Sequence, residues 1–298
     1  MRRSIALTVA LLAGLGLPVS TQFRSSVAVV RVDVLVTDGR RPVRGLSAQQ
    51  FEIRDNGVRQ DVTDVQYETL PLNVVCVLDL SGSVAGPPLE HLKQAYLSVI
   101  DALAGDDRGA LVTFASKATL HAPLTADRTR LRTLADRLSS EGATSLYDAV
   151  FAALALREAD QGRTLVLLLS DGRDTASWLT ARQVVDAARR TDVVLYPVTV
   201  TAPPVVRGPG RVPFVPPDEV AANQFLSALA DETGGRVVSA DHDARLPATL
   251  LAILKEFRER YVVSYAPTGV TAGGWHAIDV RVKGRRLTVK ARRGYAAN

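Results

Sequence analysis

The chain has 298 residues, of which 47% are hydrophobic and 22% are charged, and these fractions are typical of a folded protein and exclude a disordered one. The length suits one large domain together with a smaller one. The net charge of +5 is concentrated in residues 255–298, where Glu256, Glu259 and Asp279 are the only acids. This pattern predicts a solvated basic strand face that could contact an anionic cell surface, and no nucleic-acid partner is expected. The single cysteine, Cys76, excludes a fold that depends on internal disulfides.

The first 21 residues, MRRSIALTVALLAGLGLPVST, have the organisation of a secretory signal peptide. A short basic start is followed by an apolar run from Ile5 to Leu17 and a break at Pro18. The run is shorter than the roughly 18 residues of a membrane-spanning helix. We therefore expect an exported protein, periplasmic or extracellular, with membrane anchoring as the alternative if the leader is not cleaved.

Both ends of the remaining chain predict antiparallel strands. Residues 27–36 alternate valine with charged residues, which is the period of a half-buried strand. Asp-Gly at 38–39 and Asn-Gly at 56–57 predict tight turns, the second one between the strands of a hairpin. The alternation returns at 278–283 and 287–292.

The middle of the chain has a different sequence pattern, in which continuous apolar runs alternate with helical stretches. The runs, typical of strands covered on both faces, are 73–79, 109–115, 164–170, 193–200 and the shorter 236–240. The predicted helices are 89–103, 128–138, 145–159, 180–190, 221–233 and 246–260. This alternation predicts an α/β fold with a doubly wound, mainly parallel sheet and helices on both faces.

Neither set of end strands makes a full sheet alone. We therefore predict that residues 22–70 and 261–298 form one small antiparallel β-domain, into which an α/β domain of residues 71–260 is inserted after a leader of residues 1–21.

Acids and hydroxyls gather where the predicted parallel strands end. Asp79, Ser81 and Ser83 follow the first run, Asp171 follows the third, and Thr144 opens a helix. The carboxyl ends of parallel strands form the ligand crevice of such sheets. Oxygen ligands without histidine or thiol suit Mg²⁺, Ca²⁺ or Mn²⁺, and a divalent cation would offset the cost of gathering two acids near an apolar sheet edge.

Each of these residues also has an ordinary structural interpretation. Thr144 or Ser145, followed by Asp148, is a helix-capping pattern. Asp171 could belong to a plain turn at the end of a strand. The two serines could simply lead into a helix that starts near Pro87.

Taken together, the segments DLSGS (79–83), GATSLYDA (142–149) and LLLSDGRDT (167–175) resemble the metal-ion-dependent adhesion site (MIDAS) of von Willebrand factor type A (vWA) domains. That pattern is D-x-S-x-S, then T, then D, and all five positions match. The resemblance covers about residues 71–260. The flanking VRGLSAQQFEIRDNG and ERYVVSYAPT resemble the A-domain proteins abundant in Acidobacteria.

The resemblance implies a role for each residue. Ser81, Ser83 and Thr144 would contact the ion, and Asp79 and Asp171 would act directly or through water. The expected cofactor is a divalent cation, Mg²⁺ first, with Mn²⁺ or Ca²⁺ as alternatives. One coordination position would stay open for a carboxylate of a protein or glycan partner, so the implied function is binding without catalysis.

Two further features belong to the same end of the predicted sheet. The proline-rich segment 201–219 follows the 193–200 strand as a long loop that either shapes the site or is a passive surface loop. Trp178 is either an aromatic anchor for a partner or a core residue of the next helix.

Two other functions stay open. A haloacid-dehalogenase-like phosphatase would use Asp79 as a nucleophile with Mg²⁺, but Ser81 stands where those enzymes carry a second acid, and the four histidines lie outside the strand-end loops. Alternatively, the protein is an envelope scaffold in which the ion serves only the fold.

Overall fold

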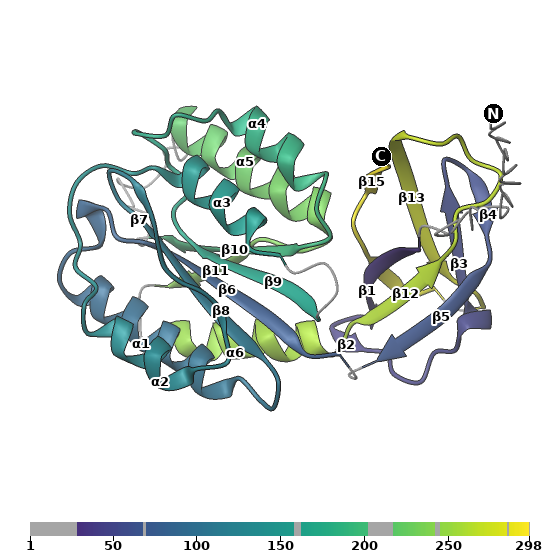
Figure 1. The fold of residues 1–298 in the computed structure, drawn as a ribbon, viewed down its shortest axis with the longest axis horizontal. Coiled ribbons are helices and arrows are strands. Elements are labelled where there is room, and N and C mark those ends of the chain that lie inside the picture. The colour runs from purple at the N-terminus through teal and green to yellow at the C-terminus, as the bar shows by residue number, and fades with distance from the viewer. Residues whose placement is uncertain are drawn as a thin grey trace, which may run out of the picture.

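The computed structural model describes residues 29–67, 70–157, 162–201, 217–241, 245–284 and 286–297. In this part the chain forms an α/β domain beside a smaller domain made of strands and one short 3-10 helix, Ala48–Gln50 (Figure 1). The predicted leader and residues 202–216 of the proline-rich segment lie outside the described residues. None of the described helices is long and apolar enough to cross a membrane.

The α/β domain is built on a six-stranded sheet in the order β11-β10-β9-β6-β7-β8. All neighbours are parallel except β8, which runs antiparallel to β7 at one edge. The strands are β6 (Leu72–Asp79), β7 (Arg108–Phe114), β8 (Ala118–Thr125), β9 (Arg163–Leu169), β10 (Val194–Thr201) and β11 (Val238–Asp241). The expected doubly wound sheet is therefore correct.

Helices cover both faces of this sheet because long stretches of its inner strands are apolar on both faces, such as 74–78 in β6 and 165–169 in β9. Along β6, Val74, Cys76 and Leu78 pack toward one set of helices, and Val75 and Val77 pack toward the other. The first set is α1 (Pro87–Ala102), α2 (Arg128–Ala135) and α6 (Leu246–Arg258), and the second is α3 (Leu146–Ala155), α4 (Ala181–Ala188) and α5 (Pro217–Thr233), as Figure 1 shows. All of these side chains of β6 are fully buried.

Two elements differ from the sequence-based expectation. Strand β8 was not predicted, because it has no continuous apolar run and it contains Pro123, which a sheet tolerates at an edge. Helix α5 begins at Pro217, inside the segment predicted as a loop, since proline suits a first helical turn and Asp218 and Glu219 favour the positive end of the helix dipole.

The smaller domain packs two antiparallel sheets around a core of valine, tyrosine and phenylalanine. One sheet has the order β14-β1-β12-β5, with β2 also paired to β1, and the other has the order β15-β13-β3-β4. Its strands are β1 (Val30–Asp38), β2 (Arg41–Pro42), β3 (Phe51–Asp55), β4 (Val58–Gln60), β5 (Val62–Tyr67), β12 (Tyr261–Tyr265), β13 (Gly274–Val282), β14 (Thr288–Lys290) and β15 (Gly294–Ala297). N-terminal and C-terminal strands thus share both sheets, as expected. The Asn56-Gly57 turn joins β3 to β4, with φ of 46° and 83° at these two residues.

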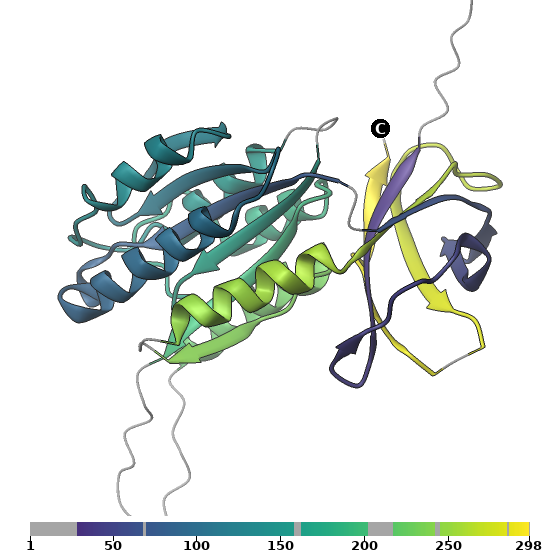
Figure 2. The same ribbon diagram turned by 90° about the horizontal axis from the view of Figure 1, so that it is seen from below.

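The α/β domain is inserted between two paired strands of the β-domain. The chain leaves through β5 and returns from α6 into β12, and Tyr67 lies opposite Tyr261 in this antiparallel pair. Figure 2 shows α6 running directly to the smaller domain. Two neighbouring strands therefore carry the chain across the boundary in both directions, as an inserted domain requires.

Buried arginines hold the two domains together. We call the contacts of Arg163 and Arg260 with Asp33 the interdomain seam. Arg163 pairs with Asp33 of β1 at 2.6 Å, and both side chains are largely buried. Arg260 is fully buried and donates to the carbonyl oxygens of Asp33 at 3.1 Å and Gly234 at 2.9 Å, and to the Tyr196 hydroxyl at 3.1 Å. Burial of a guanidinium requires such hydrogen bonds, and the one nitrogen of Arg260 without a hydrogen bond, Nε, lies 3.9 Å from the Asp33 carboxylate.

Candidate metal centre

The first loop of the site follows β6, whose last residue is Asp79. The Asp79 side chain is buried, with Oδ1 accepting the Ser81 backbone N–H at 2.9 Å and Oδ2 accepting the Ser170 hydroxyl at 3.3 Å. Burial raises the pKa of Asp79; its hydrogen bonds from Ser81 act in the opposite direction, and the nearby Asp171 carboxylate raises it further. An ionised Asp79 is thus held in an unfavourable environment beside a second acid.

Ser81 and Ser83 turn their hydroxyls toward each other. Their Oγ atoms are 3.1 Å apart across a short 3-10 turn, Gly82–Val84. Ser81 is buried and Ser83 is exposed, so the pair extends from the floor of the loop to its surface. The two-residue spacing predicted this arrangement, because residues i and i+2 of a tight loop can face the same point.

The loop that carries Thr144 lies directly against the first loop. Glu141 N–H donates to Leu80 O at 2.9 Å, and Gly82 N–H donates to Gly142 O at 3.1 Å. Thr144 is half-buried. The hydroxyl of the next residue, Ser145, is buried without a hydrogen-bond partner in the described part of the chain.

The third loop follows β9 and carries Asp171. Its Oδ1 accepts the Arg173 backbone N–H at 3.0 Å, and its Oδ2 lies 3.8 Å from Arg173 Nε, which is also 3.7 Å from the carboxylate of Asp218. This loop is joined to the second one, because the carbonyl of Thr144 accepts the backbone N–H groups of Thr175 and Ala176 at 2.8 and 3.0 Å. All three predicted loops therefore meet at one end of the sheet.

Two acids organise the third loop, and the sequence analysis did not assign them this role. Asp148 on α3 accepts the backbone N–H groups of Trp178 and Leu179 at 3.1 and 3.0 Å, and Asp174 accepts that of Tyr147 at 3.2 Å. Their sequence signal was only an acid one turn into a predicted helix and an acid in a polar loop, which many proteins share.

Two of the ordinary interpretations are wrong. The residue before α3 is Ser145, and its side chain makes no capping hydrogen bond, while Asp148 binds loop amides instead of the helix start. Trp178 is not a core residue, because it lies before α4 and its side chain is 94% exposed. Helix α1 does begin with Pro87, as expected.

The side chains fit a hard divalent cation. They offer two carboxylates and several hydroxyls, one of which, that of Ser145, has no other partner. Over the residues that the structure describes, no three His, Cys, Asp or Glu side chains come together to hold a metal, so an ion at this edge would depend on the hydroxyl oxygens. Such an oxygen set suits Mg²⁺, Ca²⁺ or Mn²⁺.

Comparison with known proteins agrees with the fold. The model of the von Willebrand factor type A domain matches residues 73–251. The chain belongs to the von Willebrand factor type A domain family. Among curated relatives, inter-alpha-trypsin inhibitor heavy chain H4 of Bos taurus is 32% identical over 145 residues, which are 44% of this chain and 16% of that protein. The chain thus spans about a sixth of that relative's length.

Two solved structures illustrate how far the vWA fold extends. A von Willebrand factor type A protein from Catenulispora acidiphila is 14% identical, with a TM-score of 0.52 over 83% of this chain and 73% of that one. Proximal thread matrix protein 1 from the mussel byssus, solved with a zinc-occupied MIDAS motif, is 16% identical, with a TM-score of 0.52 over 68% of this chain and 50% of that one. At these identities the likeness shows a shared fold.

Proposed function

We propose that this vWA protein is an exported binding module that holds a divalent cation and captures a carboxylate-bearing partner through it, without catalysis. The proposed ligands are Asp79, Ser81, Ser83, Thr144 and Asp171. The observation that carries the proposal is the meeting of three loops around a buried aspartate whose pKa is raised by burial and by the neighbouring Asp171.

A cation offsets the unfavourable charge at this end of the sheet. Two carboxylates near an apolar sheet edge repel each other, and a bound Mg²⁺ would supply the positive charge that stabilises both. The mussel protein with zinc in its MIDAS motif supports a divalent ion in this fold. Hydroxyl and carboxylate oxygens favour Mg²⁺ over zinc for this chain.

The exposed Trp178 supports a macromolecular partner. Trp178 is 94% exposed, yet its backbone is fixed through Asp148 to α3, which starts two residues after Thr144. A rigidly held, solvent-facing tryptophan is typical of an anchor in a protein interface. We infer that a partner offers an acid to the ion and an apolar surface to Trp178.

Two of the four histidines lie away from the metal ligands, which supports binding over catalysis. His121 accepts or donates a hydrogen bond with Thr113 at 2.8 Å, and burial lowers its pKa. His276 is buried in the β-domain against Asp55 at 2.7 Å. Neither residue belongs to the three loops of the metal centre, and Ser81 still stands where a phosphatase would need its second acid. Export is inferred from the predicted leader.

The test measures metal and partner binding together. Wild type, Asp79→Ala and the control Asp192→Asn, which changes an exposed carboxylate, are titrated with Mg²⁺ by calorimetry and then used to capture partners from the native envelope fraction. We expect wild type and the control to bind Mg²⁺ and to retain a partner that EDTA releases, and Asp79→Ala to do neither. Capture that survives both EDTA and Asp79→Ala would refute the proposal.

The two alternatives predict different results. A scaffold with a structural ion predicts that the double change Ser81→Ala and Ser83→Ala lowers the melting temperature but leaves capture unchanged. A phosphatase predicts Mg²⁺-dependent turnover of p-nitrophenyl phosphate that Asp79→Asn abolishes.

A further inference from the structure

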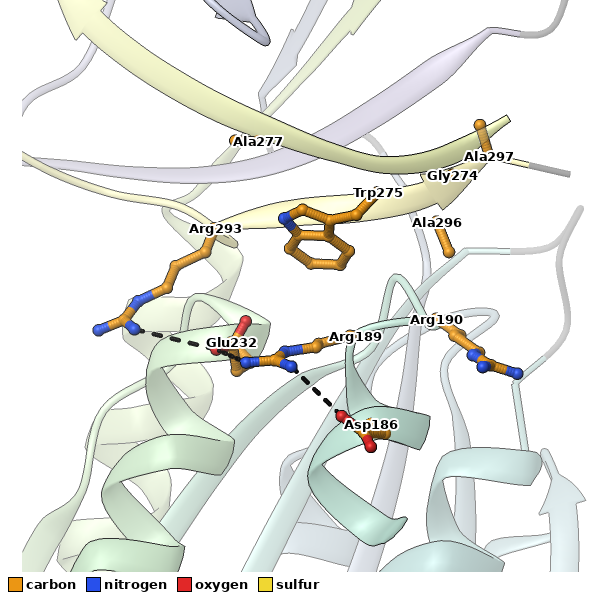
Figure 3. Close-up of a pocket in the computed structure, with 10 residues that line it drawn as sticks. All are labelled: Asp186, Arg189, Arg190, Glu232, Gly274, Trp275, Ala277, Arg293, Ala296 and Ala297. Carbon is orange, nitrogen blue, oxygen red and sulfur yellow. Dashed lines mark hydrogen bonds and ion pairs between the residues drawn. The ribbon is translucent and has the colours of Figure 1, made fainter. Parts of the chain in front are cut away.

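A cavity of about 960 Å³ lies where the β-domain meets the α/β domain, far along the chain from the metal ligands. Its walls come from the ends of α4 and α5 and from strands β13 and β15, as Figure 3 shows. Because both helices follow parallel strands, their last turns lie at the end of the sheet opposite to the metal centre. The lining residues are Asp186, Arg189, Arg190, Glu232, Gly274, Trp275, Ala277, Arg293, Ala296 and Ala297.

One wall of the cavity is a flat apolar surface on the face of the β-sheet. Trp275 lies opposite Ala296, and Ala277 lies opposite Gly294, in the antiparallel pairing of β13 with β15. Residues directly opposite each other share a face of the sheet, so small residues surround the indole. Trp275 is 41% exposed, so part of its apolar ring is open to a ligand.

The facing wall is a set of charged groups held in fixed positions. Arg189 donates to Glu232 at 3.0 Å and to Asp186 at 3.2 Å, and Arg293 binds Asp231 at 2.7 Å. Glu232 is only 7% exposed. The guanidinium carbon of Arg189 lies 5.8 Å from the centre of the Trp275 ring (Figure 3), so Arg189 covers one part of the indole and a ligand would contact the part that stays exposed. Pre-positioned donors and acceptors of this kind orient a ligand with little loss of side-chain entropy.

The charge of the cavity favours an anionic ligand. Three arginines line it against two acids, Asp186 and Glu232. Arg189 and Arg293 already have acidic partners, whereas Arg190 is exposed and forms no ion pair within the described ranges. A guanidinium without a partner is suited to a carboxylate, which it can bind through two parallel hydrogen bonds.

We propose that this interdomain cavity binds an acidic saccharide, with the apolar face of one uronic-acid ring against Trp275 and its carboxylate on Arg190. The pyranose hydroxyls would hydrogen-bond to the fixed charges of Asp186, Arg189 and Glu232. An amphipathic ring of this kind matches a cavity with one apolar and one charged wall. An acidic peptide fits less well, because it would pair along the free edge of β15, whereas the cavity is walled by the sheet face that carries Trp275 and Ala296.

The chain allows a direct test, because Trp178 and Trp275 are its only tryptophans. In a Trp178→Phe background, the fluorescence of Trp275 is followed during titration with tri-galacturonic acid, and calorimetry on the wild-type chain measures the same binding. We expect saturable quenching. Arg190→Glu should weaken binding by about tenfold or more, since a charge-assisted contact is replaced by repulsion. Arg130→Glu, the same charge change on exposed α2, should leave binding unchanged.

Two further sets of measurements identify the class of ligand and distinguish binding in this cavity from binding at the metal centre. The neutral galactotriose and a triglutamate peptide should each bind at least about tenfold more weakly than the acidic sugar. EDTA and Asp79→Ala should have no effect, so failure of the metal proposal would leave this one standing. Absence of quenching, equal binding of the peptide or the neutral sugar, or wild-type affinity in a folded Arg190→Glu variant would each overturn the proposal.

Discussion

The metal centre and the interdomain seam both bury charge, but they resolve it in opposite ways. At the seam, Arg260 has carbonyl and hydroxyl acceptors around it, and Arg163 is paired with Asp33. At the metal centre, Asp79 lies buried beside another acid, and the Ser145 hydroxyl has no partner among the described residues. The seam pairs opposite charges and thus serves stability, although Arg260 Nε has no hydrogen-bond partner among the described residues, whereas the candidate metal centre places two acids together, which favours binding of a cation.

The largest expected effect on stability comes from breaking the seam. Arg163→Ala would leave Asp33 with only the more distant Arg260 Nε at 3.9 Å, and losing one member of a buried pair typically destabilises by about 3–5 kcal/mol. Urea unfolding followed by circular dichroism measures this loss. Calorimetry on the folded fraction should show unchanged Mg²⁺ affinity.

A matched change at the surface sharpens this prediction. Arg132 pairs with Asp101 where both side chains are about half exposed, so Arg132→Ala should shift stability by no more than about 1 kcal/mol. Equal effects of Arg132→Ala and Arg163→Ala would mean that burial of the seam pair is not what matters.

The next effect is the stabilisation that Mg²⁺ supplies to the metal centre. At a Mg²⁺ concentration about 100 times the dissociation constant, binding stabilises the folded state by about 2.7 kcal/mol. The combined change Ser81→Ala and Ser83→Ala should remove this gain and leave the stability in EDTA close to that of wild type. Thermal melting with and without Mg²⁺ measures both values. A double variant that keeps the full Mg²⁺ shift would exclude these serines as ligands.

We expect acidic pH to weaken the hydrogen bonds that Glu256 of α6 accepts from Tyr196 and Arg236. Burial of Glu256 opposes its ionisation, but hydrogen bonds from Arg236 and Tyr196 outweigh burial and hold the pKa below its ordinary value of 4.5. A carboxyl group whose pKa is lower in the folded state than in the unfolded state stabilises the fold at pH values above its unfolded-state pKa. This stabilisation is lost as the pH falls through the folded-state pKa. We therefore expect stability to fall below about pH 4.5.

The variant Glu256→Gln checks this assignment. Its stability should depend less on pH in the same acidic range, as measured by urea unfolding at a series of pH values between neutral and acid. An unchanged pH profile would assign the acid sensitivity to other carboxylates.

The smallest effect on stability is expected at the rim of the metal centre. Trp178 is 94% exposed, so Trp178→Ala should change the free energy of unfolding by less than about 0.5 kcal/mol. Capture of the partner from the envelope fraction should nevertheless drop, because truncating an interface tryptophan typically removes a large share of the binding energy. Full capture by this variant would leave the ion as the main anchor.

Much of the α/β domain could be predicted, because its residues carry local signals. Continuous apolar runs marked β6, β7, β9 and β10, and the two-residue spacing of Ser81 and Ser83 marked the loop where their hydroxyls meet. Strand β8 and the start of α5 escaped prediction, because an edge strand and a proline-rich helix start look like loops when their neighbours are unknown.

The sequence by itself predicted most of the order of strands and helices and the oxygen-rich chemistry of the candidate metal centre, since periodicity and short-range spacing are local properties of the chain. Only the tertiary structure decided which distant residues meet. The pairing of Arg163 with Asp33, the loop amides held by Asp148 and the cavity beneath Trp275 each join residues separated by 30 or more positions. Such contacts depend on packing and strand register, which local patterns do not specify.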